Sequence, residues 1–358
     1  MKKRIVIILL CLLFAGCEKS VVSRQDVSSG EIRTVSLIAV GDNLIHDSVY
    51  KSAARGEGYD FRPIFAGVAP VIAGHDLKFV NQETILGGVE IGLSSYPRFN
   101  SPFEVGDALV ELGFNLISVA NNHTLDRGEV GVFNAVNYWQ AQPVVYAGAE
   151  KDAAAETVKR FAVNGVRFAF IAYTYGTNGI PHPGEKSHLA NVYADEKARV
   201  DIEGVRAAVD VVIVSMHWGE EYQDYPNAEQ KRQAAYLSDL GADIIIGHHP
   251  HVIQPVDLIK NKSGRETFVI YSLGNFLSGQ VGTNRLIGMA VSLVIELDGA
   301  ELKLVDPKAR LLFHYRDHGA YRVIPYSEIP EGFLSDYDYY FARKKKLIRH
   351  YYENIAVY

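Results

Sequence analysis

Five short apolar runs recur along the chain, and each ends in a cluster of polar residues. The runs cover residues 34–40, 77–80, 116–120, 210–214 and 243–246. Amphipathic segments with helical spacing lie between them, at residues 61–73, 103–112, 128–140, 195–209 and 226–240. Short apolar runs that alternate with amphipathic helices predict an α/β fold whose strands are buried.

The polar residues that follow these runs are all oxygen or imidazole donors. They are Asp42, Glu83, Asn122 with His123, His217, and His249 with His251. Ligands of α/β proteins bind beyond the carboxyl ends of the strands, so we expect these side chains to meet at one edge of the fold. A donor set without cysteine suits Mn, Fe, Zn or Mg in a catalytic site rather than a structural zinc site. Each cluster taken alone is also typical of an ordinary turn.

The densest cluster of histidines lies in residues 243–254, which read DIIIGHHPHVIQ. Gly247 ends the apolar run, and His248, His249 and His251 follow it closely. If the segment stays extended, His249 and His251 point to one side and His248 points to the other. This alternation predicts His249 and His251 as ligands. The alternative is a loop whose three histidines are solvated or packed.

A second dense cluster, residues 121–128, reads NNHTLDRG. Asn122 offers an amide oxygen to a metal, and His123 is a candidate acid or base. Asp126 is a candidate partner that fixes the orientation of the imidazole. The alternative for His123 and Asp126 is a contact at the start of the next helix.

Turn sequences between other apolar segments predict hairpins. Three such turns lie at residues 164–165, 261–265 and 298–299. The first of them is Asn164-Gly165, a strong signal for a two-residue hairpin loop. Hairpins bring antiparallel pairs into the fold, so we expect mixed rather than purely parallel sheets.

Length and composition are those of a globular protein with a sizeable core. The 358 residues are 48% hydrophobic and 22% charged. The formal net charge of −6 gives no electrostatic basis for binding nucleic acid. Both cysteines, Cys11 and Cys17, lie near the N-terminus, so no disulfide is expected in the rest of the chain.

The N-terminus has the form of a targeting segment. Three basic residues at positions 2–4 precede an apolar run at 5–14, which is short for a membrane span. Phe14-Ala15-Gly16-Cys17 resembles the lipobox of bacterial lipoproteins. The resemblance implies a signal peptide at residues 1–16 and a lipid on Cys17, which would anchor the protein to a membrane outside the cytoplasm. The alternative is an ordinary secretory signal that is cleaved nearby.

The ordered motifs of the chain resemble those of the CapA family of poly-γ-glutamate capsule synthesis proteins, which are related to calcineurin-like metallophosphoesterases. The matching motifs are Gly41-Asp42, Asn81-x-Glu83, Asn121-Asn122-His123-x-x-Asp126-x-Gly128, His217-Trp218-Gly219-x-Glu221-Tyr222, Gly247-His248-His249-Pro250-His251-Val252-x-Gln254 and Tyr271-Ser272-Leu273-Gly274-Asn275-Phe276. The resemblance covers residues 34–300 and implies a four-layer αββα sandwich with its metal site on loops at the strand ends. A metallophosphoesterase-like domain is therefore expected at residues 34–325. A flexible tether (17–33) precedes it and a helical tail (326–358) follows it.

The same resemblance implies a set of residue roles. Asp42, Glu83, Asn122, His217, His249 and His251 would ligate one or two divalent metal ions. His123, oriented by Asp126, would protonate a leaving oxygen while a metal-activated water attacks a phosphoryl or acyl centre. The expected partners are a phosphoester substrate or an anionic polymer, and membrane proteins of capsule synthesis. The competing class is a non-catalytic factor that binds or exports an anionic polymer and uses the metal for binding only.

Two positions depart from the patterns of these families. Gln82 stands where Leu is usual in an Asn-Leu-Glu motif. Leu44 stands where the Asp-x-His pattern of phosphoesterases has His, and His46 replaces that ligand only if the turn folds back. The missing imidazole at position 44 favours the binding factor, whereas the retained pair of His123 and Asp126 favours the hydrolase.

Overall fold

The computed structural model describes residues 32–358, which form one compact unit. The predicted signal peptide, the lipid site at Cys17 and all but the last two residues of the predicted tether lie outside the described residues. Within residues 32–358, no helix combines the length and hydropathy needed to cross a membrane.

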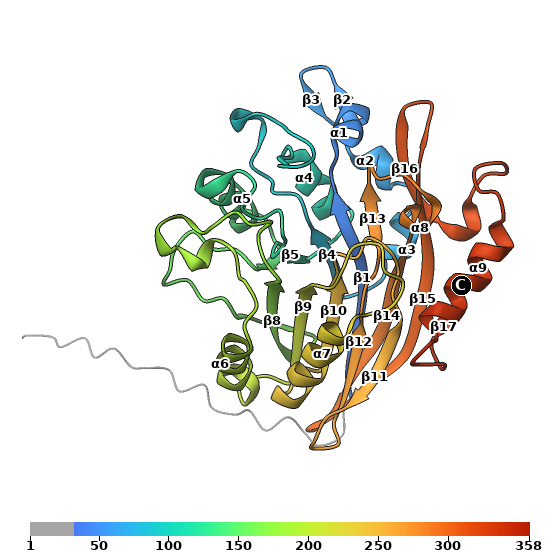
Figure 1. Cartoon of the computed structure of the whole chain (residues 1–358). Helices are drawn as coiled ribbons and strands as arrows, with labels where there is room; N and C mark the ends of the chain where they lie inside the picture. Colours follow the sequence, from blue (N-terminus) through green and yellow to red (C-terminus); the bar gives the residue numbers. More distant parts are fainter. Residues whose placement is uncertain (1–31) are drawn as a thin grey trace, which may run out of the picture. The chain divides into compact units, whose positions relative to one another are not determined.

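Two β-sheets form the centre of the unit (Figure 1). The larger sheet has the order β16 (Ala320–Pro325), β15 (Glu301–Asp317), β14 (Ile287–Asp298), β1 (Arg33–Leu44), β4 (Leu77–Gln82), β5 (Leu116–Ser118) and β6 (Val145–Ala147), with β13 (Asn275–Ser278) on β1 and β17 (Ala356–Val357) on β15. The smaller sheet has the order β11 (Val256–Lys260), β12 (Glu266–Ile270), β10 (Ile244–His248), β9 (Val211–His217), β8 (Val166–Thr174) and β7 (Lys159–Val163). A short ribbon of β2 (Ala54–Arg55) and β3 (Gly58–Tyr59) stands apart.

Helices connect these strands. The α-helices are α1 (Asp47–Ala53), α2 (Arg62–Phe65), α3 (Ala69–Ile72), α4 (Glu104–Glu111), α5 (Gly128–Gln140), α6 (Asp195–Arg206), α7 (Ala228–Leu240), α8 (Thr283–Leu286) and α9 (Tyr337–Ile348). Single turns of 3₁₀-helix occur at Val89–Ile91, Pro183–Glu185, Ser187–Leu189 and Tyr326–Glu328.

Side-chain alternation along the strands separates the apolar residues into layers. In β1, Leu37 and Ala39 belong to the core between the two sheets, where they meet Phe168 and Phe170 of β8. Their neighbour Ile38 faces the opposite way, into a second core that contains residues of α1 to α5. A third core joins the outer face of the smaller sheet to α6 and α7. The predicted four-layer αββα sandwich with mixed sheets is therefore confirmed.

Two predicted elements differ from the structure in their extent. The strand predicted at 34–40 continues to Leu44, because its last residues pair in parallel with β13, with Asp42 opposite Asn275. The amphipathic segment 61–73 forms two short helices, each with a proline in its first turn. Pro70 has no amide hydrogen and its ring obstructs the preceding turn, so one continuous helix cannot form there.

The hairpin predicted at Asn164-Gly165 is confirmed. Val163 and Val166 pair across the turn between β7 and β8, and both turn residues have positive φ, 48° and 77°. This is the backbone geometry that an Asn-Gly loop favours.

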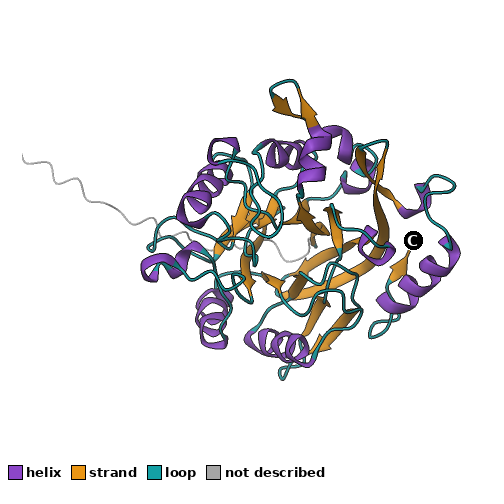
Figure 2. Cartoon of the chain, turned by 45° about the horizontal axis from the view of Figure 1, so that its top comes forward, coloured by secondary structure: helices purple, strands orange, loops and turns teal. Residues whose placement is uncertain are grey.

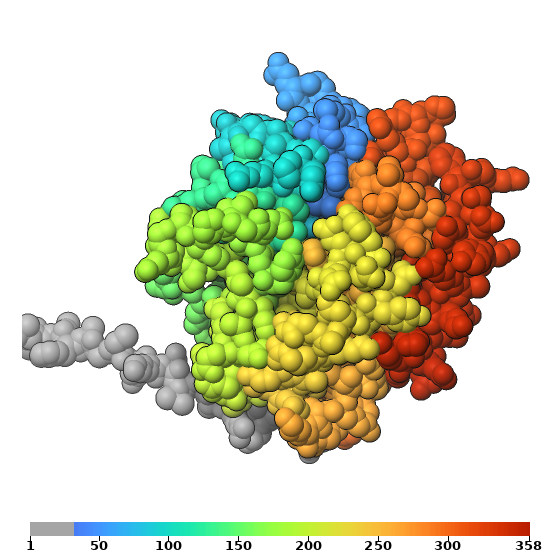
Figure 3. Space-filling model, viewed as in Figure 1, coloured from blue at the N-terminus to red at the C-terminus, as the bar shows by residue number. Residues whose placement is uncertain are grey.

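The predicted tail, residues 326–358, packs on the larger sheet. It contains α9 and ends in β17, which pairs in parallel with β15. Ile348, Ile355 and Val357 join the core between the sheets. In the space-filling view, the red C-terminal segment lies directly against the orange segment that precedes it (Figure 3). The tail therefore belongs to the same compact unit as the strands that precede it.

Candidate metal centre

Residues from both sheets meet at the carboxyl ends of the strands. Asp42, Glu83 and Asn122 come from β1 and from the residues that follow β4 and β5, all in the larger sheet. His217 and His248 end β9 and β10 of the smaller sheet, and His249 and His251 follow β10. All seven side chains are buried. Figure 2, in which the top of Figure 1 comes forward, shows the loops gathered over these strand ends.

The histidines and carboxylates form two groups that could each hold a metal ion. The groups are Asp42 with His217 and His248, and Glu83 with His249 and His251. Within each group the candidate ligand atoms all lie within 4.8 Å of one another. The two groups also adjoin, because Nε2 of His217 is 3.9 Å from Oε1 of Glu83 and Nδ1 of His251 is 3.2 Å from Oδ2 of Asp42. The structure therefore brings five of the six predicted ligands into a single cluster and adds His248.

The environment of the Glu83 carboxylate indicates whether the cluster fits a cation. Its carboxylate is buried, and neither oxygen has a hydrogen-bond partner among the described residues. Burial raises the pKa of Glu83 well above its usual range. A buried carboxylate without a partner is costly unless a cation or a proton neutralises it. Oxygen and imidazole donors around an unsatisfied carboxylate fit a divalent metal ion.

The protonation states of the histidines also fit metal binding. Burial, followed by the neighbouring His249, lowers the pKa of His217 well below its usual range. Burial lowers the pKa of His248 to about 4 and the pKa of His249 to about 3. These three rings are therefore neutral near pH 7, which is the form that binds a metal.

His251, unlike the other three histidines, is protonated near pH 7. Burial alone would lower its pKa, but Glu83 and Asp42 outweigh that effect and raise the pKa of His251 to about 9. In turn, although burial opposes the change, His251 holds the pKa of Asp42 below its usual value. Without a metal ion, the proton on His251 thus supplies the positive charge that the two buried carboxylates require. A metal ion that binds here would replace that proton.

The backbone after β10 is not extended, which corrects the predicted alternation. His249 and His251 have φ values of 101° and 59°, in the left-handed region. These turns bring all three rings toward the cluster, and the rings of His217 and His249 are 4.6 Å apart. His248 does not point away from the cluster. Its Nδ1 donates to Nδ1 of His217 at 2.8 Å, because the hydrogen of His217 is on Nε2, which donates to Oδ1 of Asn122. The sequence signal that could have identified His248 is its place at the end of a strand beside the strand of His217.

Two glycines allow the strands to approach one another at this edge. A Cβ atom at Gly41 would lie 1.8 Å from the carbonyl oxygen of Gly274, and one at Gly247 would lie 2.1 Å from that of Tyr271. Both positions therefore require glycine, which explains why a glycine directly precedes Asp42 and His248.

Asn122, the sixth predicted ligand, lies directly against the cluster. Its Oδ1 accepts a hydrogen bond from Nε2 of His217 at 2.9 Å. Its Nδ2 donates to Oδ1 of Asn178 at 3.2 Å. An amide oxygen in this position fixes the ring of His217 at the edge of the candidate metal centre.

His123 and Asp126 form the predicted dyad. Nδ1 of His123 donates to Oδ2 of Asp126 at 2.7 Å, and both side chains are buried. The amide of Phe99 also donates to Oδ2 of Asp126 at 2.7 Å, and the Phe99 ring meets His123 edge-on at 4.7 Å. With Nδ1 held in this way, Nε2 is the ring nitrogen that can give or take a proton. The pair therefore has the oriented His–Asp geometry that a catalytic acid or base requires.

His46 does not replace the histidine that is missing at position 44. Its Nδ1 accepts the amide hydrogen of Gly279 at 3.0 Å, and its ring packs edge-on against Phe99 at 5.1 Å. His46 is in neither ligand group. Leu44 is buried and pairs with Ser278 of β13.

Asn275, Asn81 and Ser215 support the cluster from outside. Asn275 Oδ1 accepts from Nδ1 of His251 at 3.0 Å, and Asn81 Nδ2 donates to Oδ1 of Asp42 at 2.7 Å. Ser215 donates to Nε2 of His248 at 2.6 Å. Asn275 and Asn81 belong to the sequence motifs, although no role followed for them from the sequence. Ser215 carries no sequence signal, because only the pairing of β9 with β10 places it there.

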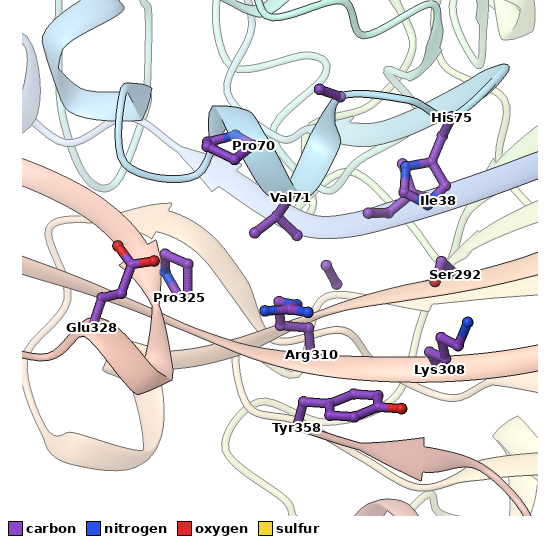
Figure 4. A pocket seen from close by; sticks show the side chains of 12 residues that line it. Ile38, Pro70, Val71, His75, Ser292, Lys308, Arg310, Pro325, Glu328 and Tyr358 are labelled. Atoms are coloured by element: carbon purple, nitrogen blue, oxygen red, sulfur yellow. The ribbon is translucent and has the colours of Figure 1, made fainter.

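A cavity of about 380 Å³ lies elsewhere, between α3 and the outer face of the larger sheet (Figure 4). His75, Lys308, Arg310, Glu328 and Tyr358 are among its lining residues. None of the candidate metal ligands lines it, so this cavity is separate from the metal centre.

The fold is shared with a solved nucleotidase. The NAD nucleotidase (NadN) of Haemophilus influenzae superposes with a TM-score of 0.50 at 12% sequence identity, over 92% of this chain and 58% of that chain. At this identity the likeness concerns the fold alone. It agrees with the phosphoesterase-type architecture that the motifs predict.

Sequence comparison gives the family. The PGA biosynthesis protein CapA of Bacillus subtilis (strain 168) is 34% identical over 175 residues, which cover 48% of this chain and 44% of that protein. The capsule biosynthesis protein CapA of Bacillus anthracis is 34% identical over 185 residues, which cover 49% of this chain and 43% of that protein. This chain thus spans less than half the length of these two relatives. A family model described as bacterial capsule synthesis protein PGA_cap matches residues 36–280, more than half of the chain. The chain therefore belongs to the PGA_cap family of bacterial capsule synthesis proteins, as its motifs predicted.

Proposed function

We propose that this protein is a metal-dependent hydrolase of the phosphoesterase type that acts in the synthesis of a capsule polymer. The observation that carries the proposal is the buried Glu83, whose carboxylate has no partner in the midst of four histidines. A structural cluster of this kind would satisfy that carboxylate with a fixed donor. A catalytic centre leaves it open for a cation and a substrate.

The side chains divide the chemical work among them. Divalent metal ions at the cluster would polarise a phosphoryl or acyl oxygen and lower the pKa of water. Asp42, Glu83, His217, His248, His249 and His251 would hold them. Asp126 accepts the hydrogen on Nδ1 of His123 and so orients the ring. In its imidazolium form, His123 would give the proton on Nε2 to the leaving oxygen. Phe99, packed against His123, keeps solvent away from one face of that ring.

The names of the relatives suggest the biological setting. The two Bacillus proteins are named for the biosynthesis of PGA and of the capsule. We therefore place the substrate among phosphoesters or γ-glutamyl bonds of an anionic polymer. The second candidate is a non-catalytic polymer-binding factor. It is supported by Leu44, which takes the place of one ligand of the phosphoesterase pattern.

His123→Ala separates the two candidates. The variant should retain its metal, because His123 is in neither ligand group, yet turnover should fall by roughly 10²- to 10⁴-fold. A substrate with a nitrophenolate leaving group needs no protonation and should lose far less. Metal content is measured on the purified protein, and turnover with paired alkyl and nitrophenyl phosphoesters and with γ-glutamyl peptides.

His75→Ala is the matched control, since this histidine lines the separate cavity of Figure 4. It should change neither metal content nor turnover. If metal-loaded wild type hydrolyses none of these substrates while His123→Ala still impairs polymer production in cells, the binding factor is the correct function.

We also propose that a lipid on Cys17 anchors the protein to a membrane outside the cytoplasm, where it would meet membrane proteins of capsule synthesis. Cys17→Ser should abolish labelling by a fatty-acid analogue and release the protein from membranes. Cys11→Ser provides the control, because these are the only two cysteines and Cys11 lies within the predicted signal peptide. Wild-type protein that takes up no label would argue for an ordinary secretory signal.

A further inference from the structure

Tyr222 stands at the rim of the metal centre. Its ring centroid is 6.1 Å from that of His251, and 46% of the residue is exposed. Its backbone is held in the left-handed region, with φ of 67°, by an amide hydrogen bond of 2.7 Å to the carbonyl of Pro250. Tyr222 is thus fixed to the same loop that carries the histidine ligands, with part of its surface open to solvent.

Arg285 lies on this tyrosine. Its guanidinium carbon is 4.8 Å from the centre of the Tyr222 ring, which is the geometry of a cation–π contact. Gly282 packs against the same side chain: a Cβ at Gly282 would lie 3.0 Å from Nη2 of Arg285. The Arg285 side chain is partly exposed, and its contact with the Tyr222 ring is not a salt bridge. The guanidinium is therefore held on the tyrosine ring rather than by a salt bridge. Burial, and after it the nearby acid Glu221, raises the pKa of Tyr222 to about 12.

One amide side chain connects this arginine to the metal centre. Nδ2 of Asn275 donates to the carbonyl oxygen of Arg285 at 3.1 Å and to Oε1 of Gln280 at 3.0 Å. Oδ1 of Asn275 accepts from Nδ1 of His251 at 3.0 Å. Gln280 Nε2 in turn donates to the hydroxyl of Tyr222 at 3.4 Å. The residue that orients a metal ligand thus also positions the segment that presents Arg285.

We propose that Arg285, supported by Tyr222 and Gln280, forms a second anion subsite beside the metal centre. It would bind an oxyanion of the substrate that is separate from the reacting group, either a carboxylate or a phosphate. A guanidinium presents a fork of donors to either group, and its stacking on an aromatic ring leaves those donors free. This inference rests on the proposed function and narrows it to substrates that carry at least two negative groups.

Three non-hydrolysable ligands test the subsite by calorimetry on the metal-loaded protein: phenylphosphonate, 4-carboxyphenylphosphonate and 1,4-phenylenebisphosphonate. The first has one anionic group, and the other two add a carboxylate or a phosphonate at the far end of the ring. Wild type should bind at least one of the doubly anionic ligands roughly 10- to 100-fold more tightly than phenylphosphonate. Which of the two gains more identifies the preferred oxyanion.

Arg285→Gln should abolish that gain and leave the affinity for phenylphosphonate unchanged, while Arg285→Lys should retain part of it. The matched control is Arg310→Gln, because Arg310 also lies over a tyrosine, Tyr358, at 5.8 Å, but in the separate cavity (Figure 4). Equal binding of all three ligands by wild type overturns the subsite. The subsite is also overturned if the tighter binding of the doubly anionic ligands persists in Arg285→Gln or is lost in Arg310→Gln.

A fourth probe, γ-linked triglutamate, separates failure of the subsite from failure of the proposed function. Binding of triglutamate that depends on Arg285, in a protein that binds no phosphonate, would support the subsite and count against a phosphoesterase. Absence of binding by all four probes would overturn the subsite.

Discussion

At the scale of single residues, the site is defined by unbalanced charge. Glu83 is a buried carboxylate with no hydrogen-bond partner among the described residues, and His251 is held in its protonated form by Glu83 and Asp42. Side chains chosen for stability alone would not leave this arrangement, since each unsatisfied buried group destabilises the fold. A bound cation would remove this electrostatic cost of the buried carboxylates.

Glu83→Gln should therefore have opposite effects with and without metal. In chelator, the variant should melt at a higher temperature than wild type, because a neutral amide replaces a buried carboxylate that destabilises the fold by about 1–3 kcal/mol. In saturating metal the order should reverse, since a charged ligand has been lost. Thermal unfolding of both proteins under both conditions checks this.

The exposed Glu328→Gln variant is the control and should follow wild type in both conditions. A Glu83→Gln protein that melts below wild type even in chelator would show that Glu83 has a structural partner.

At the scale of elements, the strand ends and helix starts place the ligands. β1 runs through Asp42 because β13 pairs with it, and α7 delivers the chain into β10, which ends at His248. α7 begins with a capping box, in which Asn227 accepts from the amide of Gln230 and Gln230 accepts from the amide of Asn227. Gln230 also donates to Oε1 of Gln254 at 2.9 Å, so the start of the helix is tied to the segment after the histidines.

Asn227→Ala should lower the free energy of unfolding by about 1 kcal/mol, the usual cost of losing an N-cap side chain. The effect is read from the denaturant midpoint. Metal affinity should change little, because Asn227 touches none of the ligands. Asn227→Asp keeps an acceptor oxygen and should stay within a few tenths of a kcal/mol of wild type. Equal losses in the two variants would show that the cap contributes nothing.

At the scale of the whole molecule, the candidate metal centre lies between the two sheets. Asp42 and Glu83 come from the larger sheet and the four histidines from the smaller one. A metal ion bound to both groups would link the layers at the one edge where polar residues interrupt the apolar core. Metal binding is therefore expected to stabilise the entire sandwich rather than a single loop.

Saturating metal should raise the melting temperature of wild type, and a metal at a hundred times its dissociation constant stabilises by about 2.7 kcal/mol. Hydrogen exchange should slow at the ends of both β1 and β10. His249→Ala and His251→Ala should each lose most of the bound metal and most of this stabilisation. His314→Ala, a buried histidine of β15 outside the ligand groups, should keep the metal-dependent shift even if its baseline stability falls. An equal shift in all variants would place the metal elsewhere.

The sequence by itself determined the layered fold, the family and most of the residues of the candidate metal centre. Apolar runs that end in Asp42, Glu83, His217 and His249 specify buried strands whose carboxyl ends carry donors, and strand ends in an α/β sheet necessarily gather at one edge. The sequence also predicted the contact between His123 and Asp126, because the two residues are only three positions apart. Local pattern suffices where the partners are near in sequence or lie at equivalent ends of strands.

Tertiary structure alone decided how the candidate ligands are divided between the two groups. The place of His248 beside His217 follows from the pairing of β10 with β9, and left-handed turns direct His249 and His251 to the same cluster. The subsite at Arg285 follows from a contact between residues 222 and 285, which no local pattern encodes. Such contacts depend on the register and packing of distant segments. Side-chain direction in a turn is set by backbone torsions rather than by strand alternation, so the sequence analysis oriented His248 wrongly. It gave no role to Arg285.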